Sequence, residues 1–160
     1  MTRRASIAAA LHELDQKCPA GFAAALHIRF TRPTYLFQTY ARRWNDHYSA
    51  TGAHMHDPAV RWGLQNTGRV RWSDLEPYDE TGFLEEAKDF GLMNGVCFAV
   101  VIGESRSIVA CARADRDFTE AETDDLERLV IELHNLTAGP GRLSPADERA
   151  LTELSIRLTR

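Results

Sequence analysis

The chain has 160 residues, a formal net charge of −4, and 44% hydrophobic and 26% charged residues. This length fits one domain with a sizeable core, and the composition is typical of a soluble globular protein. The acidic balance argues against a nucleic-acid-binding module in this stretch, because such domains usually carry a basic surface. No run is apolar enough to span a membrane, and charges break residues 1–17 too early for a secretory signal, so we expect a cytoplasmic protein.

The three cysteines, Cys18, Cys97 and Cys111, are odd in number and lack the spacing of metal ligands. Cys97 and Cys111 lie in apolar runs, so the sequence predicts buried free thiols. A disulfide between them is disfavoured in a reducing cytoplasm.

The first half of the chain alternates between helical and extended patterns. Apolar residues at positions 7, 8, 11 and 14 follow a helical period, which Cys18-Pro19-Ala20-Gly21 ends. Asp57 before Pro58 is a good helix start, because aspartate accepts backbone N–H bonds and proline suits the first helical position. The predicted elements are a helix over 5–17, strands over 22–30 and 35–38, and helices over 41–50 and 57–65.

The second half predicts a hairpin and a long helix. Residues 103–106 separate two apolar runs, which is typical of a β-hairpin with a turn of roughly four residues. Thr119 and Glu122 form a capping box, in which each side chain can bond the backbone N–H of the other residue. The predicted elements are a strand over 69–72, a helix over 81–90 ended by Gly91, strands over 96–102 and 107–114, and a helix from 119 to about 136.

This order of elements predicts an α+β fold. We expect an α-β-α sandwich with a central antiparallel sheet of about five strands and helices on both faces, because the hairpin requires antiparallel pairing. A stretch rich in glycine and proline over 137–142 is expected to be a linker, which sets one domain at 1–136. Residues 143–160 begin with a serine cap and a proline, which predicts a further helix.

An aromatic stretch from Tyr40 to Trp72 is the main candidate for function. Tyr40, Trp44 and Tyr48 recur every four residues, so in a helix their rings lie along one face. Together with Asp57 they supply rings with polar tips and a carboxylate, which a buried pocket for a small amphipathic ligand needs. An aromatic stripe is more often ordinary core, and Asp57 is also explained as a helix cap. The pattern alone leaves core and pocket both open.

The spacing of these residues resembles the autoinducer-binding domain of LuxR-type quorum-sensing regulators. The family pattern is Tyr, Trp and Tyr at four-residue steps, an Asp-Pro nine residues on and a Trp fifteen further, as Asp57-Pro58 and Trp72 match here. The match continues without a gap into Phe90-Gly91-Leu92-Met93-Asn94-Gly95.

The resemblance implies an N-acyl homoserine lactone as ligand, bound between the sheet and one helical layer, with no cofactor and no catalysis. Trp44 would donate its indole N–H to the lactone carbonyl, Asp57 would accept the amide N–H, and Tyr40 would donate to the acyl carbonyl. Tyr48 would pack over the head group, and Trp72 would close the lactone end.

The acyl tail would meet positions that differ from the family pattern. Gly95 would let a strand approach where a side chain would fill the pocket. Positions that often carry hydroxyls in relatives are Cys97 and Ala110 here, which removes the expected partner of a 3-oxo group. The apolar residues expected to contact the ligand are Leu36, Val60, Val100 and Val109.

The resemblance also implies partners. Residues 143–160 would open the helix-turn-helix DNA-binding domain that follows the sensor in this family, truncated or absent here, since so short a segment cannot hold a recognition helix. DNA contact would depend on that domain. We expect homodimers, with the helix over 119–136 as a candidate interface, and no membrane association.

Other readings have weaker support. His54-Met55-His56-Asp57 resembles a metal cluster, but the following positions lack ligand chemistry, so we predict no metal site. A lactone-cleaving enzyme with Asp57 as base would need a nucleophile and oxyanion donors, and neither is apparent. The remaining alternative is a LuxR-like sensor without a DNA-binding domain that binds a different small molecule or pairs with a full-length regulator.

Overall fold

The computed structural model describes residues 1–160, in which helices and strands alternate largely as predicted. The helices are α1 (Arg3–Lys17), α2 (Arg42–Ala50), α3 (Pro58–Gln65), α4 (Phe83–Lys88), α5 (Glu120–Ala138) and α6 (Pro145–Leu158), with short 3₁₀ turns at Ala53–Met55, Trp72–Asp74 and Glu76–Tyr78. The strands are β1 (Phe22–Arg29), β2 (Arg32–Gln38), β3 (Gly68–Arg71), β4 (Asn94–Ile102) and β5 (Ser105–Arg113).

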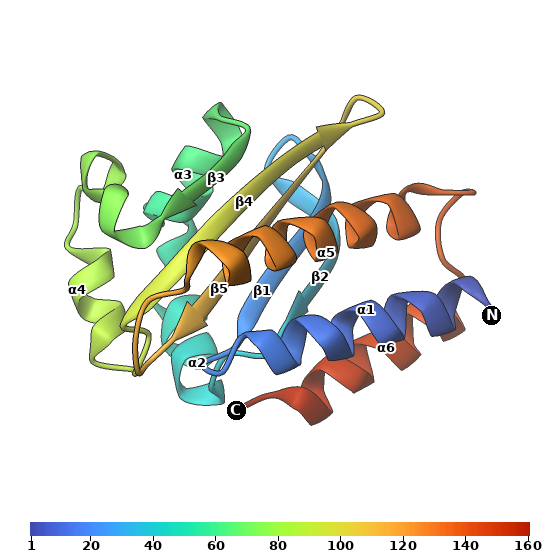
Figure 1. The fold of residues 1–160 in the computed structure, drawn as a ribbon, viewed down its shortest axis with the longest axis horizontal. Coiled ribbons are helices and arrows are strands. Elements are labelled where there is room, and N and C mark those ends of the chain that lie inside the picture. The colour runs from blue at the N-terminus through green and yellow to red at the C-terminus, as the bar shows by residue number, and fades with distance from the viewer.

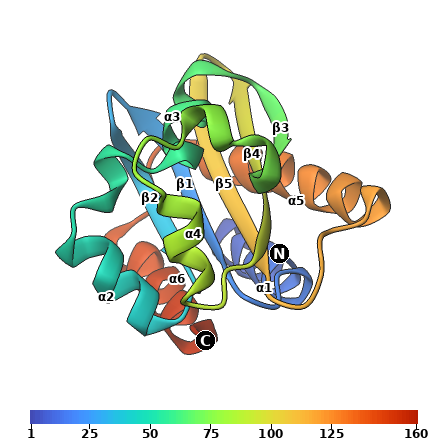
Figure 2. The ribbon, with the colours of Figure 1, turned by 90° about the vertical axis from the view of Figure 1, so that its left-hand side faces the viewer.

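The five strands form one antiparallel sheet in the order β2-β1-β5-β4-β3. Helices α1, α5 and α6 cover one face, and α2, α3 and α4 cover the other, as Figures 1 and 2 show. The predicted α+β fold with an antiparallel sheet between helices is therefore confirmed. The larger core lies between the sheet and α1, α5 and α6, because alternate strand residues such as Phe22, Val96 and Val109 point to that side.

Helix α5 begins with the predicted capping box. The hydroxyl of Thr119 accepts from the backbone N–H of Glu122 at 3.1 Å, and the Glu122 carboxylate accepts from the backbone N–H of Thr119 at 2.8 Å. Leu126, Val130 and Leu133 then face the sheet. This cap fixes where the helix starts over the sheet.

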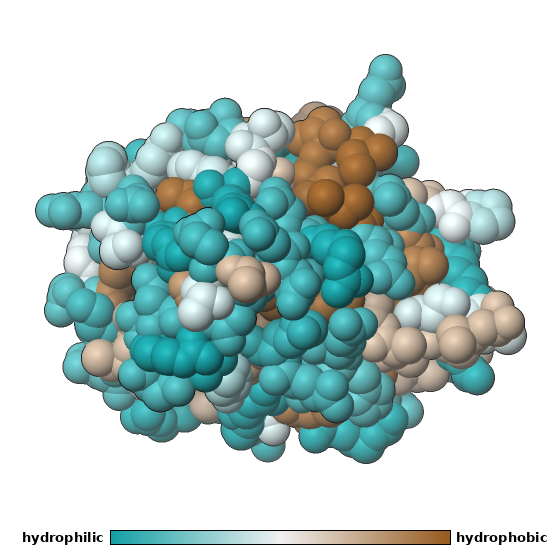
Figure 3. Space-filling model, viewed as in Figure 1, coloured by the Kyte–Doolittle hydropathy of each residue, from teal (hydrophilic) through white to brown (hydrophobic).

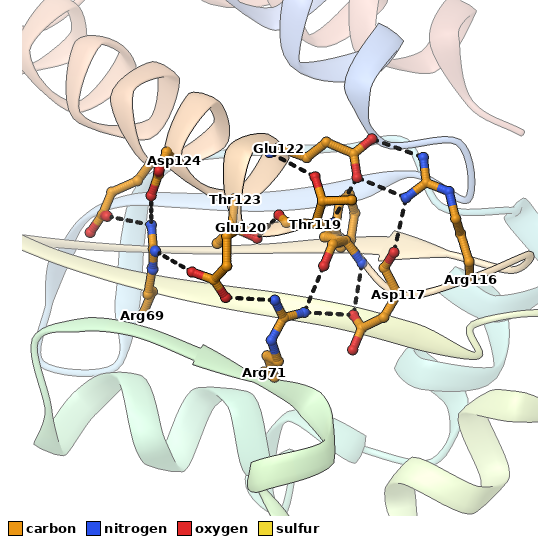
Figure 4. A network of polar contacts seen from close by, with 11 residues as sticks. Arg69, Arg71, Arg116, Asp117, Thr119, Glu120, Glu122, Thr123 and Asp124 are labelled. Carbon is orange, nitrogen blue, oxygen red and sulfur yellow. Dashed lines mark hydrogen bonds and ion pairs between the residues drawn. The ribbon is translucent and has the colours of Figure 1, made fainter.

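An ion-pair network ties the start of α5 to the edge strand β3 (Figure 4). Arg69 contacts Asp124 at 2.6 Å and Glu120 at 3.0 Å. Arg71 contacts Glu120 at 2.9 Å and Asp117 at 3.1 Å. Side chains alternate along a strand. Since Arg69 and Arg71 lie on the face of α5, Val70 between them lies on the opposite face of the sheet.

The β4–β5 hairpin turns more tightly than predicted. Ile102 pairs with Ser105, so only Gly103 and Glu104 form the turn, instead of the four residues expected. Both turn residues have positive φ, 64° and 61°, and such two-residue turns match the twist of paired strands. The predicted turn of four residues was wrong. Gly103 and Glu104 both adopt positive φ, so two residues suffice for the turn, and Ser105 and Arg106 pair in β5.

Helix α4 is shorter than the predicted helix over 81–90. The Asp79 carboxylate accepts from the backbone N–H groups of Phe83 and Leu84 at 2.9 and 3.1 Å, which fixes the first turn. Gly91 ends the segment with φ of 84°, as its position after the helix predicted.

Helix α6 packs against α1 and β2. Ser144 caps it, and Leu143, Leu151 and Leu154 are buried in the larger core. The assignment of 143–160 to the start of a DNA-binding domain stays a prediction. All three cysteines are buried free thiols, as predicted.

Candidate ligand-binding site

Helix α2 carries Trp44 and Tyr48 of the aromatic stripe, whereas Tyr40 lies just before the helix, and all three rings are at once core and cavity wall. Trp44 is 3% exposed and contacts the rings of Tyr48, Phe83 and Phe90 with centroid distances of 5.9, 5.4 and 5.2 Å. All three contacts are edge-on, the geometry that aromatic rings prefer. The two interpretations left open by the sequence are therefore compatible.

A cavity of about 290 Å³ lies between the sheet and helices α2, α3 and α4. Most of its lining is hydrophobic, with a few polar groups, as is typical of small-molecule sites. Eight of the twelve residues expected at the ligand site line it: Leu36, Tyr40, Trp44, Tyr48, Asp57, Val60, Trp72 and Ala110. The structure thus brings together residues from β2, α2, α3 and β5.

Gly95 and Cys97 do not line the cavity but lie behind Trp72. The indole of Trp72 rests against Gly95, where any side chain would overlap it. Its N–H donates to the Cys97 sulfur at 3.2 Å. Both residues therefore position Trp72, which is a different role from the direct contact expected.

Asp57 is the only carboxylate that lines the cavity. One oxygen accepts from the backbone N–H of Ala59 at 2.9 Å and caps α3, and the other accepts from the Tyr48 hydroxyl at 2.8 Å. Burial raises the pKa of Asp57, while the bonds from Tyr48 and Ala59 oppose that rise. Each carboxylate oxygen can accept two hydrogen bonds and accepts one here, so each keeps a site for a further donor.

The two tyrosines differ in their partners. The Tyr40 hydroxyl donates to the Ala110 carbonyl at 3.2 Å, whereas the Tyr48 hydroxyl donates to Asp57. Burial is the main cause that raises the pKa of each phenol. Both therefore remain protonated donors at neutral pH.

Trp44 provides a free donor at the buried end of the cavity. Its indole N–H has no acceptor within the protein, although every fully buried polar side-chain atom has a partner. This N–H is therefore open to the cavity that the ring lines. Together with the spare acceptor sites of Asp57, it gives a donor and an acceptor close to aromatic rings.

Two residues expected in the tail site point the other way. Val100 and Val109 belong to the larger core under α1, α5 and α6. Because side chains alternate along a strand, Ala110 on the cavity side requires its neighbour Val109 on the opposite face. The same alternation identifies Ile108 as a lining residue, which the sequence reasoning missed.

Other lining residues missed from the sequence are small or polar. Ala23 and Ala25 on β1 and Gln38 on β2 line the cavity. Strand alternation around the predicted Leu36 would have identified Gln38. No group of three or more histidine, cysteine or acidic side chains is placed to hold a metal ion, and His54 lines the cavity.

Comparison with known proteins decides the family. Residues 21–136 match the model of the autoinducer binding domain. The chain belongs to this family. It is thereby an autoinducer-binding domain of the LuxR type, as its aromatic spacing predicted, and this family is not one of enzymes.

Two regulators are similar to the autoinducer-binding chain in sequence. The quorum-sensing regulator RhlR of Pseudomonas aeruginosa is 31% identical over 112 residues, which are 66% of this chain and 46% of RhlR. The transcriptional activator SolR of Ralstonia nicotianae is 32% identical over 103 residues, which are 63% of this chain and 43% of SolR. The chain therefore spans less than half the length of these relatives.

Solved structures agree with this fold. SdiA of Escherichia coli superposes with a TM-score of 0.61 at 19% identity, over 80% of this chain and 59% of that one. SdiA in complex with octanoyl-rac-glycerol gives a TM-score of 0.65, also at 19% identity, over 86% of this chain and 60% of that one. At this identity the likeness concerns the fold.

None of the helices here is long and apolar enough to cross a bilayer.

Proposed function

We propose that this domain binds an N-acyl homoserine lactone in the cavity between the sheet and α2–α4. The observation that carries the proposal is the free Trp44 N–H together with the spare acceptor capacity of the Asp57 carboxylate, both at a wall of aromatic rings. A lactone carbonyl needs a donor and an amide N–H needs an acceptor, and a flexible acyl chain needs an apolar cavity.

Each polar group then has one role. Trp44 donates to the lactone carbonyl, and Asp57 accepts the amide N–H. Tyr40 redirects its hydroxyl from the Ala110 carbonyl to the acyl carbonyl, and Tyr48 holds the carboxylate of Asp57 in place. Trp72 packs on the lactone end.

A second ligand class is an acylglycerol. Its support is that SdiA, a structure of the same fold, is in complex with octanoyl-rac-glycerol. Such a molecule has hydroxyl donors for Asp57 and an ester carbonyl for Trp44, but it lacks an amide N–H. The alternative function remains a LuxR-like sensor without a DNA-binding domain that binds a different small molecule or acts by pairing with a full-length regulator.

The whole protein's role follows from its relatives. RhlR and SolR are a quorum-sensing regulator and a transcriptional activator, so we propose a cytoplasmic transcription regulator in which a C-terminal domain contacts DNA. We also propose a homodimer. Figure 3 shows an apolar patch on the face covered by α5, and two exposed apolar residues of β4 and α5 are Ile102 and Ile131, at 44% and 37%.

Thermal melting with a ligand panel tests the proposal. The panel contains N-acyl homoserine lactones with and without a 3-oxo group, a monoacylglycerol and a free fatty acid of matched chain length. A ligand present at 100 times its dissociation constant adds about 2.7 kcal/mol to the free energy of unfolding, so the melting temperature rises measurably. We expect the largest rise with a lactone. A rise with the acylglycerol alone would establish the second class, and no rise from any member would reject both.

A further inference from the structure

The cavity continues from the aromatic rings to the tip of the β1–β2 hairpin. Tyr40 and Trp44 at one end are 6% and 3% exposed. At the other end Thr31 is exposed and Leu36 is 48% exposed, although both still line the same cavity. Exposure therefore increases along the cavity away from the polar groups. The hairpin tip lies at one corner of the sheet face that α2, α3 and α4 cover (Figure 2).

Small side chains form a continuous floor along β1. Ala23 pairs with Ala110 of β5 on one side and Gln38 of β2 on the other, and Ala25 pairs with Leu36. All five residues line the cavity. The methyl groups of Ala23, Ala25 and Ala110 leave a groove beside the longer side chains of Leu36 and Gln38 on β2, and this groove follows the direction of β1.

The course along β5 is narrowed by a bulky side chain, although Ile108 and Ala110 still line the cavity. Ile108 packs into the space above Gly63 of α3, where a Cβ would lie 2.6 Å from the Ile108 side chain. Along β1 the cavity reaches Ile28 and Pro33. From Ala23 to Ile28 the strand extends roughly 16 Å at its usual rise per residue, somewhat less because of a bulge between Ala25 and Ile28.

We infer that the acyl chain of the ligand runs along β1 over Ala23 and Ala25 and leaves the protein beside Leu36 at the β1–β2 hairpin. This inference rests on the proposed function and adds the class of ligand: long, unbranched acyl chains whose far end is exposed. The apolar side chains of Ile28, Pro33 and Leu36 cover the chain up to its exit, and the carbons beyond it are in water.

A ligand with a bulky group at the far end of its chain tests the exit. Dissociation constants are measured by titration for dodecanoyl-homoserine lactone and for the same lactone with a fluorophore on its terminal carbon. An open end predicts that the two constants agree within threefold, and that a soluble quencher such as iodide reaches the bound fluorophore. A loss of more than tenfold on labelling, with the unlabelled lactone bound, overturns the inference and leaves the proposed function standing. If neither lactone binds, the proposed function is rejected, and this inference with it.

Substitutions of the floor test the course of the chain. Ala25→Phe fills the groove, so we expect it to weaken dodecanoyl- and hexadecanoyl-homoserine lactone at least tenfold and to leave butanoyl-homoserine lactone unchanged. Ala25→Ser keeps the side chain small and is the matched control. Since Ala25→Phe risks misfolding, its melting without ligand is compared with that of Ala25→Ser, and the labelled lactone decides the question without any variant. Equal loss for short and long chains, in a folded variant, contradicts the proposed course.

Discussion

The indole of Trp72 lies directly against the backbone of Gly95, in a space that any side chain at position 95 would occupy. The contact joins the 3₁₀ turn after β3 to the start of β4. It leaves the Trp72 N–H bonded to Cys97 and the opposite part of the ring on the cavity. A glycine away from the ligand thus defines one wall of the binding site.

Replacement of this glycine tests the contact. We expect Gly95→Ala to lower the free energy of unfolding by about 1–3 kcal/mol, as overpacking of a filled core does, and to weaken ligand binding by moving Trp72. Gly139→Ala is the matched control, since Gly139 has extended backbone at φ −166° and no close neighbour. Urea unfolding of both variants measures the difference. A Gly95→Ala protein as stable as Gly139→Ala would contradict the close packing.

The parts of the site that lie close in sequence were predictable. The pair Trp44 and Tyr48 on α2 and the Asp57-Pro58 helix start depend on local geometry alone, and their elements form as predicted, whereas Tyr40 lies before the helix. The bond between Tyr48 and Asp57 was not predicted, because it spans a loop whose course depends on packing. The network of Arg69 and Arg71 with α5 joins residues about fifty positions apart, and their charges alone do not reveal the pairing.

The residues around the acyl tail were predicted less well than those around the head group. Val109 was assigned to the ligand together with Ala110, although neighbours on a strand face opposite sides. Ala23 and Ala25 carry no signal in one sequence, because an alanine alone does not indicate which face of the sheet it lies on or what it contacts. Their meaning appears only when the register places them beside Ala110 and Leu36.

We expect Gln38 to select the 3-substituent of the ligand. It lines the cavity beside Ala23, its amide makes no hydrogen bond within the protein, and neither Cys97 nor Ala110 offers a hydroxyl. Because a neutral hydrogen bond contributes about 0.5–1.5 kcal/mol, Gln38→Leu should weaken a 3-oxo lactone roughly two- to tenfold and spare the unsubstituted one. Titration calorimetry with the matched pair measures this. Equal changes for both ligands would exclude the role.

A histidine pair between the sheet and α5 should make stability depend on pH. His27, at φ 54° in the β1 bulge, bonds Ser105 and the His134 carbonyl at 2.7 and 2.9 Å, and its ring lies 4.4 Å from that of His134. Burial, then the charge of His134 and that of Arg3, lower the pKa of His27 below its usual 6.5, although the His134 carbonyl opposes this.

The direction of the pH dependence follows from the pH at which His27 takes up its proton in the folded and the unfolded chain. The unfolded chain takes up a proton near pH 6.5 and the folded His27 only at lower pH, so stability falls as pH drops below about 6.5 until it passes the lowered pKa. We expect His27→Gln to reduce the dependence of the melting temperature on pH between neutral pH and the lowered pKa of His27. His12→Gln, at an exposed site on α1, should keep the wild-type slope. Parallel slopes for the two variants would show that His27 is not the group responsible.

The ion pairs of β3 should stabilise the domain in a salt-dependent way. The carboxylates around Arg71 are partly exposed, so each pair is worth about 0.2–1 kcal/mol and is screened by salt. Arg71→Gln should therefore lower the melting temperature at low salt and less so at high salt. Arg157→Gln, an exposed arginine of α6 without an ion pair, is the control. A loss for Arg71→Gln that does not change with salt would indicate packing in place of charge.

The most direct test of the account is the effect of Asp57→Asn on lactone binding. Asparagine is as good a helix cap as aspartate, and its side-chain amide can still form a hydrogen bond with the Tyr48 hydroxyl, so the variant should fold. Its amide, however, presents a donor toward the amide N–H of the ligand, where the carboxylate accepts. Hydrogen bonds to charged groups contribute about 1.5–3 kcal/mol, so affinity should fall more than tenfold, and less in Tyr48→Phe. Thermal melting of both variants with the preferred lactone measures this. A folded Asp57→Asn protein that the lactone stabilises as much as wild type would contradict lactone binding through Asp57.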